Sequence, residues 1–214
     1  MLFPVVLILI KKQFSIPFIA LVIYFFCTSI YNFLIIAFPH FPKDARRFLG
    51  VSNNFLDAPL MLLFLSHFTQ SAGVKKMIRI SLLAFLVFES GIVLLYGFSV
   101  KSISIFSGPG LIIVLSFSFY FFTRHISLTI IHKREVAKTL MISGILFAYA
   151  VYFMVYLFYY VLETPNKMDA FIIYCLASLA ASILLTAGLL SQKKAVLKEV
   201  LEERGKLKVP RLTV

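Results

Sequence analysis

Charged residues are scarce in this chain of 214 residues: they make up 14% of it, against about 25% in an ordinary soluble domain. Hydrophobic residues reach 61% and the mean hydropathy is +0.97. No polar segment is long enough to form a separate soluble domain. The composition therefore predicts an all-α polytopic integral membrane protein, whose functional groups lie in the spans, the loops or the tail.

Cysteines and recognisable motifs are also few. The two cysteines, Cys27 and Cys175, both lie in apolar segments, so we expect no disulfide and no CxxC metal site. Walker, GxSxG and CxxCH patterns are missing. The start MLFPVVLILIKK has neither a preceding basic residue nor a small-residue cleavage site, so we expect the mature chain to keep it.

Six apolar stretches are long enough to cross a bilayer, which takes about 20 residues. The first ten residues are too short, and they could lie at the interface, re-enter the membrane or belong to a seventh helix. Gly108-Pro109-Gly110 predicts a kink or break in its helix. We predict one bundle over residues 1–191 and a basic tail over 192–214. The predicted spans are 16–38, 53–70, 77–99, 104–131, 139–162 and 171–191.

Basic residues are unevenly shared between the two sides of this six-span arrangement. Nine Lys and Arg residues of the loops and N-terminal region and seven of the tail lie on one side, and five lie on the other. The positive-inside rule then places both termini in the cytoplasm of a multi-pass cell-membrane protein, with a bacterial inner membrane expected. The same spread of charge over loop ends argues against nucleic acid as a partner. The tail either only fixes the orientation of the protein in the membrane or contacts a cytosolic partner. The sequence also leaves open whether the protein forms homo-oligomers.

Asp57 and Glu89 are the strongest functional signals, because a charged Asp at the centre of a span costs about 2.5–3.5 kcal/mol on insertion scales. Helical rise places Glu89 near the midplane and Asp57 about 6 Å inside the outer end of its span. The central part of every span lacks Lys and Arg. We therefore expect Glu89 to be neutral unless a cationic ligand joins it. The alternative is a purely structural carboxyl that bonds a neighbouring hydroxyl.

Tyrosines and small polar residues add a second signal. Tyr149, Tyr152, Tyr156 and Tyr160 are spaced by three, four and four residues and share one helical face. Near mid-depth the first two need hydrogen-bond partners, whereas Tyr159 and Tyr160 are typical of an interfacial belt. The small residues Ser178, Ser182 and Thr186 are spaced by four, which is typical of close packing between membrane helices.

Depth joins these residues into one predicted pocket that opens to the outer face. The outer half should hold Asn53 with most of the other polar groups, and Glu89 should form the floor. The pocket is typical of a site for a small lipophilic or amine-bearing ligand, or for protons, in a sensor, receptor or transporter. The predicted ligand-binding residues are Asn32, Asn54, Asp57, Glu89, Tyr149, Tyr152, Tyr156 and Ser178.

Two other classes of function remain open from the sequence. In one, a membrane-embedded enzyme acts on a lipid with Asp57 or Glu89 as general acid or base. In the other, the chain is a structural membrane subunit, and its polar groups only hold helices together.

The histidines form a competing set, because three of them can hold a catalytic zinc. His67, His125 and His132 all fall near predicted cytoplasmic helix ends, a layout that resembles the multi-span zinc hydrolases such as the alkaline ceramidase group. A paired HxxxH is missing, and basic residues follow His132. Microbial rhodopsins attach retinal to a lysine in their last helix, and 171–191 has none. We therefore predict no metal and no cofactor.

Overall fold

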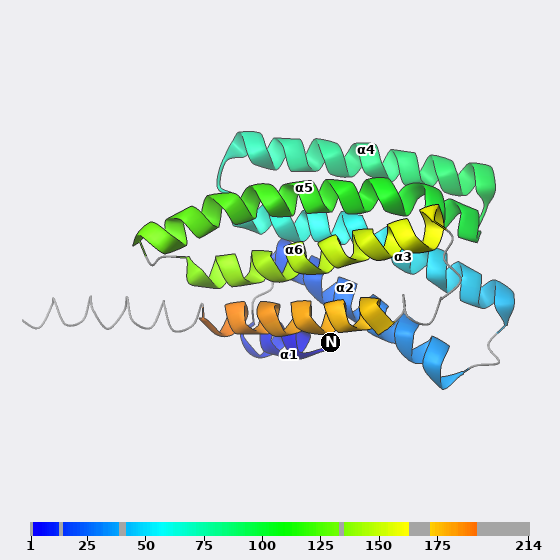
Figure 1. The fold of residues 1–214 in the computed structure, drawn as a ribbon, viewed down its shortest axis with the longest axis horizontal. Coiled ribbons are helices and arrows are strands. Elements are labelled where there is room, and N and C mark those ends of the chain that lie inside the picture. Colours follow the sequence, from blue (N-terminus) through cyan, green and yellow to red (C-terminus); the bar gives the residue numbers. More distant parts are fainter. Residues whose placement is uncertain (1, 13–14, 39–41, 133–134, 163–171, 192–214) are drawn as a thin grey trace, which may run out of the picture.

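The computed structural model is a bundle of long helices that run along one axis of the molecule (Figure 1). It describes residues 2–12, 15–38, 42–132, 135–162 and 172–191. Within this part there is no strand, and six helices are long and apolar enough to cross a membrane, which confirms the predicted fold class. The elements are α1 (Phe3–Ile10), α2 (Ile16–Ala37), α3 (Lys43–Leu65), the 3-10 turn η1 (Ser66–Phe68), α4 (Ala72–Tyr96), α5 (Val100–His132), α6 (Val136–Tyr156), the π-helical turn η2 (Leu157–Val161) and the last span, Ile172–Ser191.

The start of α3 differs from the sequence prediction. The helix begins at Lys43, not at residue 53. Its first turns are polar: Asp44 and Arg47 face each other at 3.7 Å, and both are exposed. An acidic residue in the first turn favours the helix N-terminus, but such a turn is invisible to a search for apolar runs.

Of the predicted kink or break at Gly108-Pro109-Gly110, the break is not present, because α5 runs without interruption from Val100 to His132. Proline still removes one helical hydrogen bond. The Ser104 carbonyl accepts a 2.8 Å hydrogen bond from the Tyr156 hydroxyl. Ser104 directly precedes the residue whose carbonyl loses its helical hydrogen bond to the proline. A Cβ on Gly108 would lie 2.6 Å from the Tyr156 hydroxyl, and one on Gly110 would lie 2.7 Å from Phe85. The glycines therefore allow neighbouring helices to approach α5.

The N-terminal helix α1 is too short to span, since eight residues rise only about 12 Å. It packs against α2 and buries Val5 and Ile8. The Lys11 ammonium donates a hydrogen bond to the Leu189 carbonyl of the last span. Of the alternatives for this segment, a seventh spanning helix is therefore excluded.

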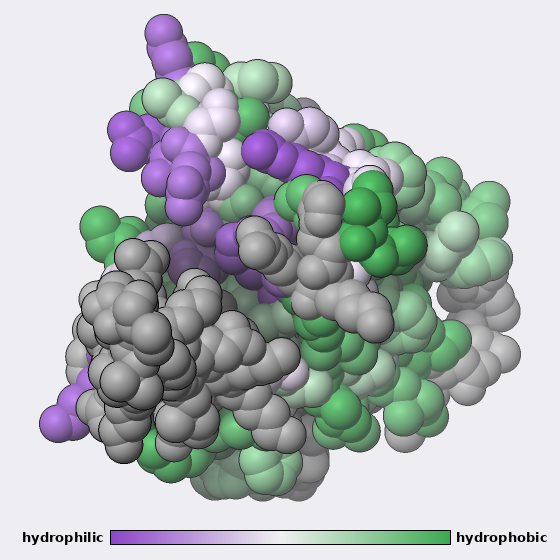
Figure 2. Space-filling view, turned by 90° about the vertical axis from the view of Figure 1, so that its left-hand side faces the viewer, coloured by the Kyte–Doolittle hydropathy of each residue, from purple (hydrophilic) through white to green (hydrophobic). Residues whose placement is uncertain are grey.

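The surface of the bundle is apolar along its sides and polar at one end. Figure 2 views the end that holds the α5–α6 connection, where hydrophilic residues gather while hydrophobic ones cover the flanks. This is the end predicted to be cytoplasmic. The outermost helix is α4 (Figure 1), with Leu94 and Leu95 86% and 77% exposed. Such a face is suited to contact with lipid tails.

The last span packs closely on α6 through small residues, as is common between membrane helices. A Cβ on Gly144 would lie 3.0 Å from Leu184 Cβ and 3.1 Å from the Ala181 carbonyl oxygen. We expect Gly144→Ala to lower the free energy of unfolding near the low end of the 1–3 kcal/mol typical of overpacking, or about 1 kcal/mol. Gly91→Ala is the matched control, because nothing lies within 4 Å of its Cβ, and it should be neutral or stabilising. Thermal melting in detergent would show equal effects if the close contact were not real.

Candidate functional site

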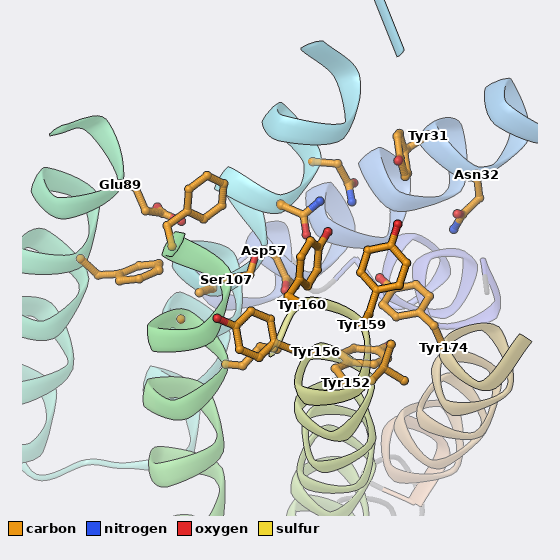
Figure 3. Close-up of a pocket in the computed structure, with 18 residues that line it drawn as sticks. Tyr31, Asn32, Asp57, Glu89, Ser107, Tyr152, Tyr156, Tyr159, Tyr160 and Tyr174 are labelled. Atoms are coloured by element: carbon orange, nitrogen blue, oxygen red, sulfur yellow. The ribbon is translucent and has the colours of Figure 1, made fainter. Parts of the chain in front are cut away.

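One end of the bundle contains a cavity of about 370 Å³. It lies where α2, α4 and α6 approach their C-terminal ends and α3, α5 and the last span begin (Figures 1 and 3), the end predicted to face outward. All six spans contribute to its wall, together with η2. The lining residues are Tyr31, Asn32, Asn53, Asn54, Asp57, Ala58, Phe85, Glu89, Phe106, Ser107, Gly110, Leu111, Tyr152, Val155, Tyr156, Tyr159, Tyr160 and Tyr174.

Glu89 is the most unusual residue of the cavity wall. Its side chain points from α4 toward α5 (Figure 3) and its exposed fraction is 0%. In the part of the chain that the structure describes, neither carboxyl oxygen has a hydrogen-bond partner. Buried polar groups in native proteins are almost always bonded. Among the described residues, Glu89 is therefore an exception to this rule.

Asp57, the other cavity acid, is held in a different way. Its Oδ1 accepts a 2.7 Å hydrogen bond from the hydroxyl of Tyr149, whose exposed fraction is 1%. Tyr149 does not line the cavity, so it orients the carboxyl from behind. The two acids thus differ: Asp57 is positioned by Tyr149, and Glu89 has no hydrogen-bond donor among the described residues.

Aromatic rings form most of the rest of the wall. Six tyrosines line the cavity, and those of α6 and η2 share one face: Tyr152, Tyr156, Tyr159 and Tyr160. The Tyr152 ring stacks on that of Tyr174 with centroids 4.4 Å apart. Its hydroxyl lies 2.5 Å from the Ser178 hydroxyl, which bonds the Tyr174 carbonyl. These contacts fix one aromatic side of the cavity.

Asn32 lies on the side of the cavity opposite to Glu89. Figure 3 shows Asn32 on α2 close to Tyr31 and Tyr174, with Asp57 nearer the middle. Asn54 donates a 2.8 Å hydrogen bond to the Gly50 carbonyl of its own helix. The cavity therefore extends from an acidic, aromatic side at α4 to an amide and phenol side at α2.

The structure brings together six of the eight residues predicted to bind a ligand. Asn32, Asn54, Asp57, Glu89, Tyr152 and Tyr156 line the cavity. Tyr149 and Ser178 lie behind it, each bonded to a lining residue. Their role in binding stays a prediction.

Sequence reasoning missed several lining residues, above all Tyr31, Ser107, Tyr159, Tyr160 and Tyr174. The last three were assigned to the interfacial belt or left unassigned. One signal could have found two of them: Tyr152, Tyr156, Tyr159 and Tyr160 follow the i, i+4, i+7, i+8 spacing of a single helical face.

The histidines belong to the opposite end of the bundle. His125 Nδ1 lies 2.5 Å from Glu135 Oε2, and its Nε2 lies 2.9 Å from the Phe68 carbonyl oxygen. Lys138 also donates to Glu135 at 2.7 Å. Partial burial alone would raise the pKa of Glu135, but hydrogen bonds with Lys138 and His125 hold it below its usual value.

These contacts tie η1, α5 and α6 together, so they explain His125 without a metal. The His67 ring packs edge-on against Phe18, with centroids 4.7 Å apart. The side chain of His132 and all of residues 192–214 lie outside the described part of the chain, and so do the predictions for them.

The fold and the cavity define a class: an all-helical, multi-pass membrane protein with an acidic and aromatic cavity at one end of six spans. No protein-family model, no curated protein and no solved structure matches this chain. Its function must therefore be inferred from the chemistry of its own residues.

Proposed function

We propose that this protein binds a small lipophilic molecule in the cavity and acts as a receptor-like sensor or a transporter for it. One observation supports this above the others: the cavity brings together two acids, one of them fully buried, with two adjacent asparagines and six tyrosines from helices far apart in sequence. Helix packing alone does not require such a void. The volume falls in the range of about 300–1,000 Å³ usual for small-molecule sites.

The composition of the wall indicates what the molecule should look like. Tyrosine and phenylalanine faces suit an apolar or aromatic body. Asn32 and Asn54 supply amide groups that can both donate and accept hydrogen bonds, so they would orient a polar end. With the cavity at the predicted outer end, the ligand would enter from the outer face of a cell membrane.

A cavity-filling variant tests this function directly. Ser107 lines the cavity, so Ser107→Phe should occupy the ligand's space and weaken binding at least about tenfold, which corresponds to 1.4 kcal/mol. Ile112→Phe is the matched control, because residue 112 is on the same helix and 50% exposed on the surface of the bundle. Purified protein in nanodiscs would be titrated with small aromatic alcohols and small aromatic ammonium compounds, and binding followed by calorimetry.

The outcomes separate the classes of function. Binding that is lost only in Ser107→Phe supports the cavity as the site, whereas binding equal in both variants, or no binding at all, contradicts it. Flux of the bound compound into proteoliposomes would then identify a transporter, and binding without flux a sensor.

A further inference from the structure

The residues around Glu89 narrow the ligand to one chemical class. Among the titratable groups that line the cavity with Glu89, α3 contributes Asp57, and α6 contributes the phenols of Tyr152 and Tyr156. The lining residues of α5 include Phe106 and Ser107, and none of the described ones carries a charge. The nearest cation on α5, Lys101, lies over the Tyr96 ring at 4.5 Å.

The described lining includes no Lys, Arg or His. Glu89 therefore faces aromatic rings and a second acid, with no basic side chain as counter-ion. An isolated carboxylate would be strongly disfavoured in such a place, so we expect Glu89 to be a neutral acid in the ligand-free protein. Even as a neutral acid its carbonyl and hydroxyl oxygens lack partners in the described structure.

A neutral ligand would satisfy this site poorly. One hydroxyl or amide could bond one Glu89 oxygen, and an apolar body could pack on the rings, but neither would bring a positive charge to the electron-rich ring faces. An organic cation uses both, because aromatic faces attract ammonium groups and a carboxylate neutralises the charge. Asp57 is less available for this task, since its Oδ1 is already bonded to Tyr149.

We propose that the ligand is an organic ammonium ion whose positive centre lies against Glu89, and that its binding expels the proton that Glu89 holds in the empty cavity. This inference rests on the proposed function of the cavity. The exchange is balanced: the cation enters, the Glu89 O–H bond breaks, its electron pair stays on the carboxylate, and the proton leaves to water at the cavity mouth. The rest of the ligand extends toward Asn32 and Tyr174 (Figure 3).

Exchange of a proton for the ligand has a measurable consequence. Where Glu89 is protonated in the empty protein and ionised in the complex, the affinity for a permanently charged ligand should rise about tenfold per pH unit. A neutral ligand should show no such slope. For a transporter, the same exchange would couple uptake or export of the cation to the proton gradient.

The test uses benzyltrimethylammonium and its neutral isostere neopentylbenzene, in which carbon replaces nitrogen. Neither probe titrates, so any pH dependence belongs to the protein. Calorimetry in buffers of different ionisation enthalpy counts the protons released by wild type, Glu89→Gln and Asp57→Asn. We expect wild type and Asp57→Asn to release about one proton per cation bound. Glu89→Gln should release none and bind the cation at least tenfold more weakly, with its affinity for the isostere unchanged.

Other results would overturn the proposal. Equal affinity for the cation and the isostere in wild type contradicts the ammonium assignment but not the proposed function of the cavity. Failure of both probes to bind, together with no effect of Ser107→Phe on the binding of any compound, contradicts both proposals. Proton release that persists in Glu89→Gln and disappears in Asp57→Asn assigns the exchange to Asp57 instead. Should Glu89→Gln fail to fold, infrared difference spectra of wild type give the answer: a protonated carboxyl band that is unchanged on cation binding contradicts the exchange.

Discussion

Replacing Glu89 with methionine is expected to raise the stability of the ligand-free protein. The carboxyl is fully buried and its oxygens are unbonded in the described structure, and such a group costs about 1–3 kcal/mol. Methionine has a similar length and fills irregular apolar gaps. For a chain of this size, 1 kcal/mol corresponds to about 2–4 °C. Glu89→Met should therefore melt several degrees higher than wild type, as measured by calorimetry in nanodiscs.

The control for this gain is Leu95→Met, on the same helix but 77% exposed to the surroundings, which should leave the melting temperature unchanged. The stabilised Glu89→Met protein should also fail to bind the ammonium probe, since buried functional groups commonly trade stability for activity. A lower melting temperature for Glu89→Met would mean that the carboxyl has a structural partner, and the cation assignment would lose its physical basis.

Position along the bundle axis could be predicted from the sequence because helical rise is uniform. Asn32, Asp57 and Tyr156 come from three different helices, yet their distances from the outer ends of their spans were enough to place them around one cavity. Rotation about each helix axis could not be predicted in the same way. Tyr149 and Ser178 have suitable depths, but their helices turn them behind the wall, where they bond Asp57 and Tyr152.

The errors have a common cause, which is that local sequence signals were interpreted without tertiary contacts. Gly108-Pro109-Gly110 predicts a helix kink or break from the properties of proline and glycine alone, but the helix is not broken, and its glycines make room for Tyr156 and Phe85. Tyr159 and Tyr160 have the composition of an interfacial belt, and only the position of α5 and α2 shows that they face a cavity.

Removing the hydroxyl of Tyr149 should destabilise the protein, because it is a buried donor to Asp57 at 2.7 Å. Tyr149→Phe leaves the Asp57 oxygen without this donor, which is expected to lower the free energy of unfolding by about 1–3 kcal/mol. Tyr120→Phe is the matched control, since that ring is 44% exposed, and it should have little effect. Thermal or denaturant unfolding in detergent measures both.

A double-mutant cycle with Asp57→Leu then isolates the interaction. Asp57→Leu alone leaves the Tyr149 hydroxyl without its acceptor, whereas the double variant removes donor and acceptor together. The double variant should therefore lose less unfolding free energy than the sum of the losses in the two single variants. Hydrogen bonds between membrane helices average about 0.6 kcal/mol in such cycles, and the bond between the buried Tyr149 hydroxyl and the Asp57 carboxyl should exceed this. Additive costs would show that Tyr149 does not hold Asp57. The Asp57 carboxyl would then be as available as Glu89 to pair with a cation, and the distinct roles of the two acids would have to be given up.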